Sequence, residues 1–538
     1  MRTFASWSDA GRCAVIAGLA LLALCSPRLS RAAPASSPPA AKIESGRLQG
    51  VREAGVDRFL GVPYAAPPVG DLRWRPPAPP RRWATTLQAT RFGGTCPQAP
   101  RGVFASPSTS EDCLYLNIYA PAGRVPRTSP KPVMVWFYGG GLFSGESNDY
   151  DGSRLARDGG VIVVTLNYRI GALGFLSHPA LNAEGHPFAN YGIMDQQFAL
   201  RWVQRNIAAF GGDPRNVTIF GQSGGGTSVM ANLVSPTAAG LFQRAINQSG
   251  THVEQIAPAT ALKAAEAFAA KAGCADQTAV CLRALSVDQV LQSQGPIIPV
   301  VAAGFPVADG TVITHSPFEA FGSGQFNRVP ILTGLVADEQ AFFLDEPNTG
   351  VVLTVDGFDR YLQSFGAENA AALTATYPVS AYPSPSEAEI AAAQGYKVCM
   401  ARTLDRMWSL HTPVYAYQFD DRATPSYFPK VSYPMGAFHT AELEFLFPRF
   451  HGGQGASHPL SPPEAVLSRE MIGDWSSFAR TGMPNAKAHP DTPWAPYTRT
   501  ADDVLSFNTP QSRMESRYGD GHHCEVWDKI IAAHKGAG

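Results

Sequence analysis

The sequence predicts an α/β protein whose central, mostly parallel sheet is flanked by helices on both faces. Two observations support this class. Short apolar runs rich in β-branched residues alternate with segments of helical character, and 45% of the 538 residues are hydrophobic, enough for a large core. Strands buried on both faces are typically continuous apolar runs. The runs predicted to be strands are residues 133–138, 161–167, 217–220, 329–334 and 414–419.

Helical segments lie between and after these strands. Residues 195–208 are predicted to form a helix, and the Ala-rich stretch 257–294 is predicted to form helices in a cap or insertion. Ser461 and Glu464 have the spacing of a capping box, in which each side chain satisfies a backbone N–H of the other residue. In the helix that follows, helical spacing places four large apolar residues on one face: Leu467, Met471, Trp475 and Phe478.

The N-terminus has the composition of a secretory signal peptide. Arg2 and Arg12 precede the apolar run 13–24, and Ala33-Pro34-Ala35 offers a cleavage site. We therefore predict a signal peptide at 1–35 and export to the periplasm or beyond. Lipid attachment at Cys25 is the alternative, but the bulky Leu24 stands where a small residue is expected. No linker-like segment falls between Gly140 and His439. We therefore predict that residues 36–538 form one domain.

Composition excludes several classes of partner. The chain has 43 Lys and Arg against 44 Asp and Glu, a formal net charge of −1, so no basic surface is expected to recruit nucleic acid. Apart from the short N-terminal run, no segment is apolar enough over a sufficient length to span a membrane. Neither nucleic acid nor a stable membrane span is therefore expected, and the oligomeric state stays open.

The run from Val217 to Phe220 ends in Gly221-Gln-Ser-Gly-Gly225, and a helix-compatible segment, 227–233, follows. A strand, a Gly-x-Ser-x-Gly turn and a helix form a nucleophile elbow. The turn leaves no room for a side chain at Gly221 or Gly225, so Ser223 is presented at its tip. This context predicts a catalytic serine, whereas a glycine-rich turn that carries a serine by chance is the alternative.

A second glycine-rich turn precedes the elbow in the chain. Gly139, Gly140 and Gly141 follow the predicted strand 133–138. Glycines let backbone N–H groups approach a ligand closely, as in the oxyanion-hole loop of a serine hydrolase. A simple tight turn would explain this motif alone, but both motifs in this order favour the hydrolase.

Longer segments make the comparison specific. Residues 59–74 (FLGVPYAAPPVGDLRW), 110–117 (SEDCLYLN), 167–175 (NYRIGALGF), 190–196 (NYGIMDQ) and 210–220 (FGGDPRNVTIF) resemble the type-B carboxylesterases and cholinesterases. The resemblance covers about residues 43–530. It implies the α/β-hydrolase fold, with hydrolysis of small-molecule carboxylic esters as the activity.

The resemblance also implies a Ser-Glu-His triad. The segment 436–445 (GAFHTAELEF) resembles the family's histidine loop and implies His439 as the base. The segment 336–343 (VADEQAFF) resembles the acid loop and implies Glu339, with Asp338 as the alternative. Gln340 stands where the family usually has Gly, so the local turn is in question. Gly140, Gly141 and Gly224 would donate N–H groups to the oxyanion, and Ser249 would lie near Glu339 and support it.

Two departures from the family pattern affect the expected substrate. Gln222 stands where the family usually has Glu, which removes a negative charge beside the nucleophile, and Gly224 replaces the usual Ala. The loop between Cys96 and Cys113 also contains no tryptophan, whereas in cholinesterases a tryptophan there binds the quaternary ammonium by cation–π attraction. Both changes argue against choline esters.

Removing Cys13 and Cys25 with the signal peptide leaves six cysteines, an even number that suits an oxidising compartment. Spacing alone permits 15 pairings. The resemblance implies the pairs Cys96–Cys113, Cys274–Cys281 and Cys399–Cys524. His522 and His523 precede Cys524, but no further ligands have metal spacing, so we expect surface residues there. Arg169 and Asp195 are predicted to form a structural ion pair.

The sequence therefore predicts a secreted serine carboxylesterase that needs no metal or organic cofactor. A lipase is the nearest alternative, but no long apolar lid is evident. A catalytically silent binding protein of the same fold is a second alternative, and the presence of all three triad candidates argues against it. Amide hydrolysis stays open. The loops at 296–309 and 381–397 are expected to line the substrate pockets.

Overall fold

The computed structural model describes residues 37–100, 106–123, 128–251, 256–294, 306–452, 455–485, 489 and 493–534. Residues Pro38–Gly538 group in one compact unit, distinct from Met1–Ser37. The predicted signal peptide, Cys25 and most of the expected pocket loop 296–309 lie outside the described residues. The division into residues 1–35 and 36–538 therefore stays a prediction.

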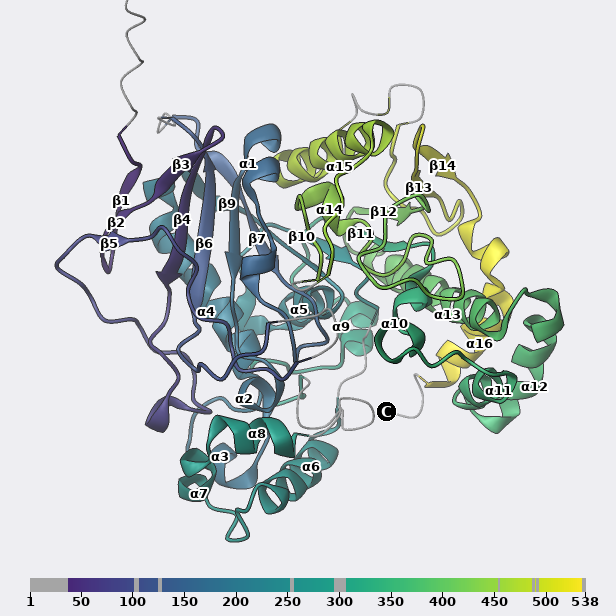
Figure 1. Cartoon of the computed structure of the whole chain (residues 1–538), viewed down its shortest axis with the longest axis horizontal. Coiled ribbons are helices and arrows are strands. Elements are labelled where there is room, and N and C mark those ends of the chain that lie inside the picture. Colours follow the sequence, from purple (N-terminus) through teal and green to yellow (C-terminus); the bar gives the residue numbers. More distant parts are fainter. Residues whose placement is uncertain are drawn as a thin grey trace, which may run out of the picture. The chain divides into compact units, whose positions relative to one another are not determined.

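An eleven-stranded sheet runs through the compact unit, with strand order β14-β13-β12-β11-β10-β9-β7-β8-β6-β4-β3 (Figure 1). The seven strands from β8 to β13 in this order pair in parallel, whereas β6, β4, β3 and β14 pair antiparallel at the two edges. A separate three-stranded sheet has the order β1-β2-β5. The mostly parallel sheet of the predicted fold class is confirmed.

The strands have the following bounds: β1 Ala40–Ile43, β2 Gly46–Gln49, β3 Val51–Glu53, β4 Val56–Pro63, β5 Leu87–Gln88, β6 Tyr115–Pro121, β7 Lys131–Phe137, β8 Ile162–Leu166, β9 Gly212–Gln222, β10 Arg244–Gln248, β11 Ile331–Val336, β12 Val414–Phe419, β13 Val504–Phe507 and β14 Arg513–Glu515. Every residue of β8, β11 and β12 is buried. Successive side chains of a strand point to opposite faces, so both faces of the sheet are covered.

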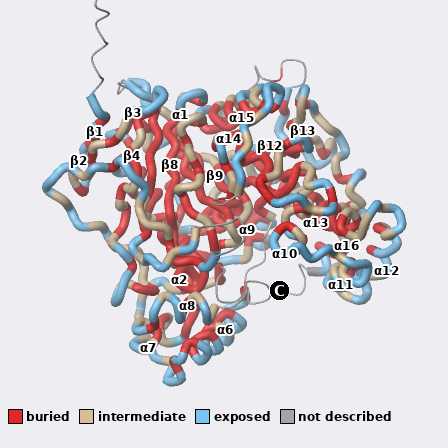
Figure 2. Tube along the Cα trace, in the orientation of Figure 1, coloured by how far each residue is buried: buried red, intermediate tan, exposed pale blue. Residues whose placement is uncertain are grey.

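The α-helices have the following bounds: α1 Ser153–Gly159, α2 Gly171–Phe175, α3 Pro179–Asn182, α4 Tyr191–Asn206, α5 Gly224–Val234, α6 Pro258–Lys271, α7 Ala279–Ala284, α8 Val287–Ser293, α9 Pro317–Ser323, α10 Glu346–Thr349, α11 Val355–Gln363, α12 Ala367–Thr376, α13 Pro385–Trp408, α14 Leu443–Leu446, α15 Pro462–Thr481 and α16 Cys524–His534. Helices α1 and α15 pack on each other and on sheet strands, and α4, α5 and α13 also contact the sheet. In Figure 2, the residues coloured as buried run along the strands of the large sheet.

Most predicted elements form, with shifted boundaries. The helix expected from residue 195 begins at Tyr191, and the strand expected at 329–334 occupies Ile331–Val336. The capping box of Ser461 and Glu464 is present at the start of α15, and the four apolar residues predicted for one helix face are buried. The stretch 257–294 forms α6, α7 and α8, which Figure 1 shows grouped beside α2 and α3.

One expected loop is a helix instead. Residues 385–397 of the segment 381–397 belong to α13. Ser384 caps this helix by accepting a hydrogen bond from the Glu387 N–H, and Pro385 occupies the first turn, where its missing N–H costs nothing. Proline and serine there mark a helix start, rather than the loop that we inferred.

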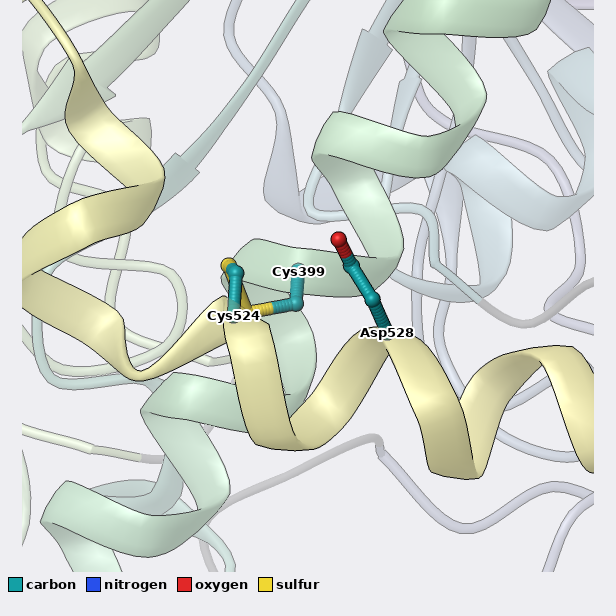
Figure 3. Close-up of side chains that lie close together, drawn as sticks. All are labelled: Cys399, Cys524 and Asp528. Atoms are coloured by element: carbon teal, nitrogen blue, oxygen red, sulfur yellow. A yellow bond between two sulfur atoms is a disulfide. The ribbon is translucent and has the colours of Figure 1, made fainter.

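The three cysteine pairs implied by the resemblance are disulfides in the structure: Cys96–Cys113, Cys274–Cys281 and Cys399–Cys524. The third joins α13 to α16 across 125 residues of sequence, and Figure 3 shows the bond between the two helices. A link across so long a loop restricts the unfolded chain more than a short one does.

Candidate active site

The turn between β9 and α5 carries Ser223 in a strained backbone conformation. Its φ of 58° and ψ of −122° lie in a region that non-glycine residues rarely adopt. The Ser223 N–H donates to the Gln248 carbonyl at 2.8 Å, and the Ser223 carbonyl accepts from the Thr227 N–H at 2.9 Å. Backbone hydrogen bonds on both sides therefore hold the serine at the tip of the turn.

The glycines of the turn are required by close backbone approach. A Cβ added to Gly225 would lie 2.0 Å from the Phe137 carbonyl oxygen, and one on Gly221 would lie 2.5 Å from the Gly225 carbonyl oxygen. Both obstacles are main-chain atoms, which cannot rotate away as a flexible side chain can. The tight turn expected from Gly-x-Ser-x-Gly is therefore present, with β7 directly beside it.

The glycine-rich loop after β7 lies against the start of α5. Gly140 and Gly141 have φ values of 103° and 62°, and the Gly140 carbonyl accepts from the Ser144 N–H at 3.0 Å. A Cβ added to Gly224 would lie 2.9 Å from the backbone nitrogens of both Gly141 and Leu142. Within the described ranges, no loop or turn carbonyl accepts the N–H of Gly140, Gly141 or Gly224. These three groups remain able to bind an anion at the helix N-terminus.

The acid loop and the histidine loop meet at an isolated pair of residues. Asp338 and Phe438 form a parallel β-bridge, and the Asp338 N–H donates to the Ala437 carbonyl at 2.9 Å. The next residue in each loop is Glu339 and His439. Glu339 Oε2 and His439 Nδ1 form a buried hydrogen bond.

The alternative acid, Asp338, is engaged elsewhere. Its carboxylate pairs with Arg422, with the shorter of the two contacts at 2.7 Å, and also accepts from the Ala437 N–H at 2.9 Å. Gln340 does not prevent the turn from forming, because residues Glu339–Phe342 form a short 3-10 helix and the Gln340 amide donates to Glu389 at 2.9 Å. The geometry therefore brings Glu339, rather than Asp338, to His439.

The helix α13 holds Glu339 from behind. The Gln394 amide oxygen accepts from the Glu339 N–H at 3.1 Å, and the Gln394 amide nitrogen donates to the Val336 carbonyl at 2.9 Å. The Val336 N–H in turn donates to Glu339 Oε1 at 3.2 Å. Both carboxylate oxygens of Glu339 are thus engaged, which fixes the orientation of the carboxylate toward His439.

Burial and the neighbouring charges together favour an ionised Glu339 and a neutral His439. Burial alone would raise the pKa of Glu339, but the adjacent His439 and then Lys397 reverse this effect and lower that pKa to about 2. Burial lowers the pKa of His439 below its ordinary 6.5, and Glu339 only partly offsets this effect. The imidazole is therefore able to accept a proton at neutral pH.

Gln222 contacts the imidazole directly. Gln222 Nε2 lies 3.2 Å from His439 Nε2 and 3.5 Å from Nδ1. In the described part of the chain, the ring's hydrogen bonds go to Glu339 and Gln222, and none goes to Ser223. Catalytic hydrogen bonds are often long without substrate and tighten in the complex. The sequence had placed Gln222 only beside the nucleophile.

Comparisons with known proteins identify the family of this chain. The sequence profile described as Carboxylesterase family matches residues 37–527. The chain belongs to this family. It is 36% identical to the fumonisin B1 esterase of Sphingopyxis macrogoltabida, over 87% of this chain and 86% of the relative, and 34% identical to the para-nitrobenzyl esterase of Bacillus subtilis, over 86% and 94%. A solved structure of a PNB esterase superposes with a TM-score of 0.77 at 32% identity, covering 92% of this chain and all of that one.

The chain is therefore an α/β-hydrolase and a carboxylic ester hydrolase, as the sequence predicted. Its family membership implies small-molecule esters as substrates. Within the described ranges, no helix is both long and apolar enough to cross a membrane.

Several residues of this carboxylesterase site were not identified from the sequence. Gln394 and Lys397 come from α13, which we had expected to be a loop up to residue 397. Glu442, three residues after His439, is fully buried and accepts from the Gln248 amide at 3.3 Å. Burial, followed by the nearby Glu339, raises the pKa of Glu442 to about 8, so this carboxyl is mostly protonated at neutral pH. Glu442 could have been found from the sequence, because it lies within the segment 436–445 that resembles the family's histidine loop.

Ser249 occupies the expected neighbourhood of the acid. Its N–H donates to the Gly334 carbonyl at 2.7 Å at the end of β11, and its hydroxyl contributes to lowering the pKa of Glu339. The Ser249 hydroxyl makes no hydrogen bond of ordinary geometry in the described chain. Arg169 and Asp195 form the predicted buried ion pair, at 2.8 Å.

His523 is exposed over 45% of its side chain, as expected of a surface residue, whereas His522 is partly buried. They line a cavity of about 380 Å³ behind the acid loop, together with Asp338, Gln394 and Arg422. Burial, which removes the imidazole from water, lowers the pKa of His522 to about 4.

Two carboxylate-containing clusters in the described residues have the size of a metal site. Cys399, Cys524 and Asp528 lie together in Figure 3, but the two sulfurs form a disulfide and Asp528 pairs with Arg402 at 2.9 Å. In the second cluster, His489 contacts Asp474 at 2.9 Å and Glu470 at 3.5 Å through its two ring nitrogens. In both clusters, the disulfide, ion pair and histidine–carboxylate contacts explain why these side chains lie together without a metal ion.

Proposed function

We propose that this carboxylesterase is a serine esterase with the triad Ser223, His439 and Glu339. The observation that carries the proposal is the buried hydrogen bond between Glu339 and His439, beside a serine strained at the tip of an elbow. A serine hydroxyl is a weak nucleophile until a neighbouring base accepts its proton. Ser223 would attack the ester carbonyl while His439 Nε2 takes the hydroxyl proton.

The negative charge that develops on the carbonyl oxygen needs fixed donors. The N–H groups of Gly140, Gly141 and Gly224 would supply them, because the loop after β7 that carries Gly140 and Gly141 lies against Gly224 at the start of α5. Glu339 would hold the imidazole in the productive tautomer and stabilise its protonated form. His439 would then protonate the leaving alcohol, and water activated by His439 would release the acid from the acyl-enzyme.

Gln222 has a specific consequence for this sequence of steps. Its amide lies at the same imidazole nitrogen that must receive the Ser223 proton. Substrate binding would have to move His439 or Gln222 slightly so that Ser223 replaces the amide as the donor to Nε2. Because Gln222 is neutral, it adds no charge that would hold the imidazolium in place.

We also propose that the enzyme is exported. The positively charged, apolar N-terminus supports this, and so do three disulfides, which form and persist in oxidising compartments. The mature protein should begin near Ser36 and contain no free thiol. Intact-mass analysis of the exported protein with and without reduction tests both points. A mature N-terminus at a lipid-modified Cys25 would contradict the proposal.

The triad is tested by covalent labelling. A fluorophosphonate probe should label the wild type at Ser223, identified by peptide mapping, and should not label Ser223→Ala. Turnover of a neutral 4-nitrophenyl ester should fall by several orders of magnitude in Ser223→Ala, since the substitution removes the attacking atom but little volume. The exposed Ser364 provides the control, because Ser364→Ala should leave labelling and turnover unchanged. Normal turnover in a folded Ser223→Ala protein would refute the assignment.

A further inference from the structure

Lys397 projects from α13 into the immediate surroundings of the triad. Its Nζ lies 3.9 Å from Glu339 Oε2 and 4.2 Å from the centroid of the Phe343 ring. The Phe343 ring lies 4.8 Å from the His439 ring and is 45% exposed. The ammonium group is thus positioned between the acid and a solvent-accessible aromatic ring that borders the base.

Lys397 lacks the close carboxylate contact that Arg169 and Arg283 make. Arg169 binds Asp195 through two side-chain hydrogen bonds of 2.8 Å, and Arg283 also binds Glu184 through two. The ammonium of Lys397 has three donors, yet no hydrogen bond joins it to a described residue, and its side chain is only 16% exposed. Glu339 and the Phe343 ring attract this ammonium, but neither accepts a hydrogen bond from it, so its donors can still bind an anion.

Glu339 is a poor candidate for that role. Its Oε2 is already hydrogen-bonded to His439, and its Oε1 accepts from the Val336 N–H. During catalysis its charge must also stabilise the protonated imidazole. The distance of 3.9 Å from Lys397 exceeds hydrogen-bond length. Lys397 therefore retains capacity for a further anion on the Phe343 side.

Apart from Glu339 itself, the side chains that contact the His439 ring in the described chain carry no negative charge. Gln222, which touches the imidazole, is neutral, and burial keeps Glu442 mostly protonated at neutral pH because its pKa rises to about 8. Glu339 is then the one ionised carboxylate that contacts the imidazole in the described chain. The Phe343 ring covers one side of the Lys397 ammonium, whose side chain is only 16% exposed, and charge recognition is stronger where water is limited.

We propose that Lys397 binds an anionic group of the substrate, so that the preferred substrates are esters whose acid or alcohol part carries a carboxylate. The proposal rests on the proposed ester hydrolysis at Ser223, because it assigns a specificity-determining residue to that same site. A carboxylate seated on Nζ beside Phe343 would also orient the ester relative to His439.

The test compares matched esters that differ only in charge. For the acid part, mono-4-nitrophenyl adipate is paired with the 4-nitrophenyl ester of adipamic acid, in which an amide replaces the carboxylate. For the alcohol part, 3-carboxyphenyl pentanoate is paired with 3-carbamoylphenyl pentanoate. In the wild type, kcat/KM should favour the anionic member of at least one pair by about tenfold or more, since a site with a buried charged donor discriminates against an uncharged analogue. The pair that shows the preference identifies the part bound.

Substitution of Lys397 decides whether this residue causes the preference. Lys397→Met should abolish it, mainly through a higher KM for the anionic ester, and Lys397→Arg should restore part of it. Lys42 lies exposed in β1, so Lys42→Met changes the net charge equally and should leave the preference intact. Each variant is first checked for folding by its melting temperature and by fluorophosphonate labelling.

The remaining outcomes each have one meaning. A wild type that is active but shows no charge preference in either pair would overturn the Lys397 proposal and leave ester hydrolysis at Ser223 standing. If Lys397→Met lowers kcat/KM equally for both members of a pair, Lys397 acts only through Glu339. That result would also overturn the Lys397 proposal. Failure of the fluorophosphonate to label Ser223 in the wild type would instead refute the proposed function itself.

Discussion

Gln222 Nε2 lies 3.2 Å from His439 Nε2, although 217 positions separate the two residues in sequence. Most members of the family carry Glu at the position of Gln222, as the resemblance implies. A buried carboxylate there would stabilise a protonated imidazole, whereas the neutral amide leaves burial as the dominant influence on His439. A charged residue in place of Gln222 would therefore change how His439 titrates.

The pH dependence of turnover should reflect this contact. Because burial lowers the pKa of His439 from its ordinary 6.5, the acid limb of kcat/KM for a neutral ester should have its midpoint below pH 6.5. Gln222→Glu should move that midpoint to higher pH by about one unit, because a carboxylate favours the protonated imidazole, which cannot act as a base. Gln222→Met serves as the control for the loss of the amide. A downward shift in Gln222→Glu would contradict this reasoning.

The two adjacent carboxylates of the acid loop should differ sharply in importance. Glu339→Gln should lower kcat on the order of 10³–10⁴-fold, because the amide cannot stabilise the imidazolium. Asp338→Asn should retain kcat within about tenfold, since Asp338 pairs with Arg422 and the Ala437 N–H rather than with His439. Steady-state kinetics on one neutral ester measures both. The opposite ranking would move the acid to Asp338.

Choline esters should be poor substrates. The Cys96–Cys113 loop has no tryptophan, Gln222 is neutral, and Lys397 adds a positive charge near Glu339. Each missing attraction would be worth about 1–2 kcal/mol, so 3,3-dimethylbutyl butyrate should be preferred over butyrylcholine by roughly tenfold to a thousandfold in kcat/KM. Equal use of both esters would show that another group binds the quaternary ammonium.

The elbow should be intolerant of a single methyl group. In Gly225→Ala the new Cβ would meet the Phe137 carbonyl oxygen at 2.0 Å, so the free energy of unfolding should fall by about 1–3 kcal/mol or more. Gly322 in α9 has nothing within 4 Å of an added Cβ, and Gly322→Ala should be neutral or stabilising by up to about 1 kcal/mol. Melting temperatures compare the two. Similar values for both variants would mean that β7 can move away from the turn.

The disulfide between α13 and α16 should contribute most to stability among the three. Replacing Cys399 and Cys524 together by Ala should lower the free energy of unfolding by about 2–4 kcal/mol, because this bond closes the longest loop. The pair Cys274→Ala and Cys281→Ala opens a loop of only 7 residues and should lower the melting temperature less. Scanning calorimetry at a fixed scan rate provides the comparison. A larger effect of the short loop would contradict the entropic argument.

Short continuous segments of the sequence were sufficient to predict several structural features of this protein. The elbow and the oxyanion loop were recognisable because glycines at fixed spacing impose a backbone path that a few neighbouring residues define completely. The capping box at Ser461 and the apolar face of α15 were predictable for the same reason, since helical geometry relates residues three and four positions apart. The acid and base segments were identified through their resemblance to a family, not through any local rule.

Tertiary packing decided which side chains meet. The choice of Glu339 over Asp338 depends on the bridge between Asp338 and Phe438, which turns the next residue of each loop toward the other. Gln394 and Lys397 reach the acid because α13 packs against β11 and the short helix at Glu339–Phe342, and the contact of Gln222 with His439 requires two loops to converge. Such contacts join residues that are about 50 to more than 200 positions apart. Their formation depends on the packing of whole elements, which no local sequence pattern encodes.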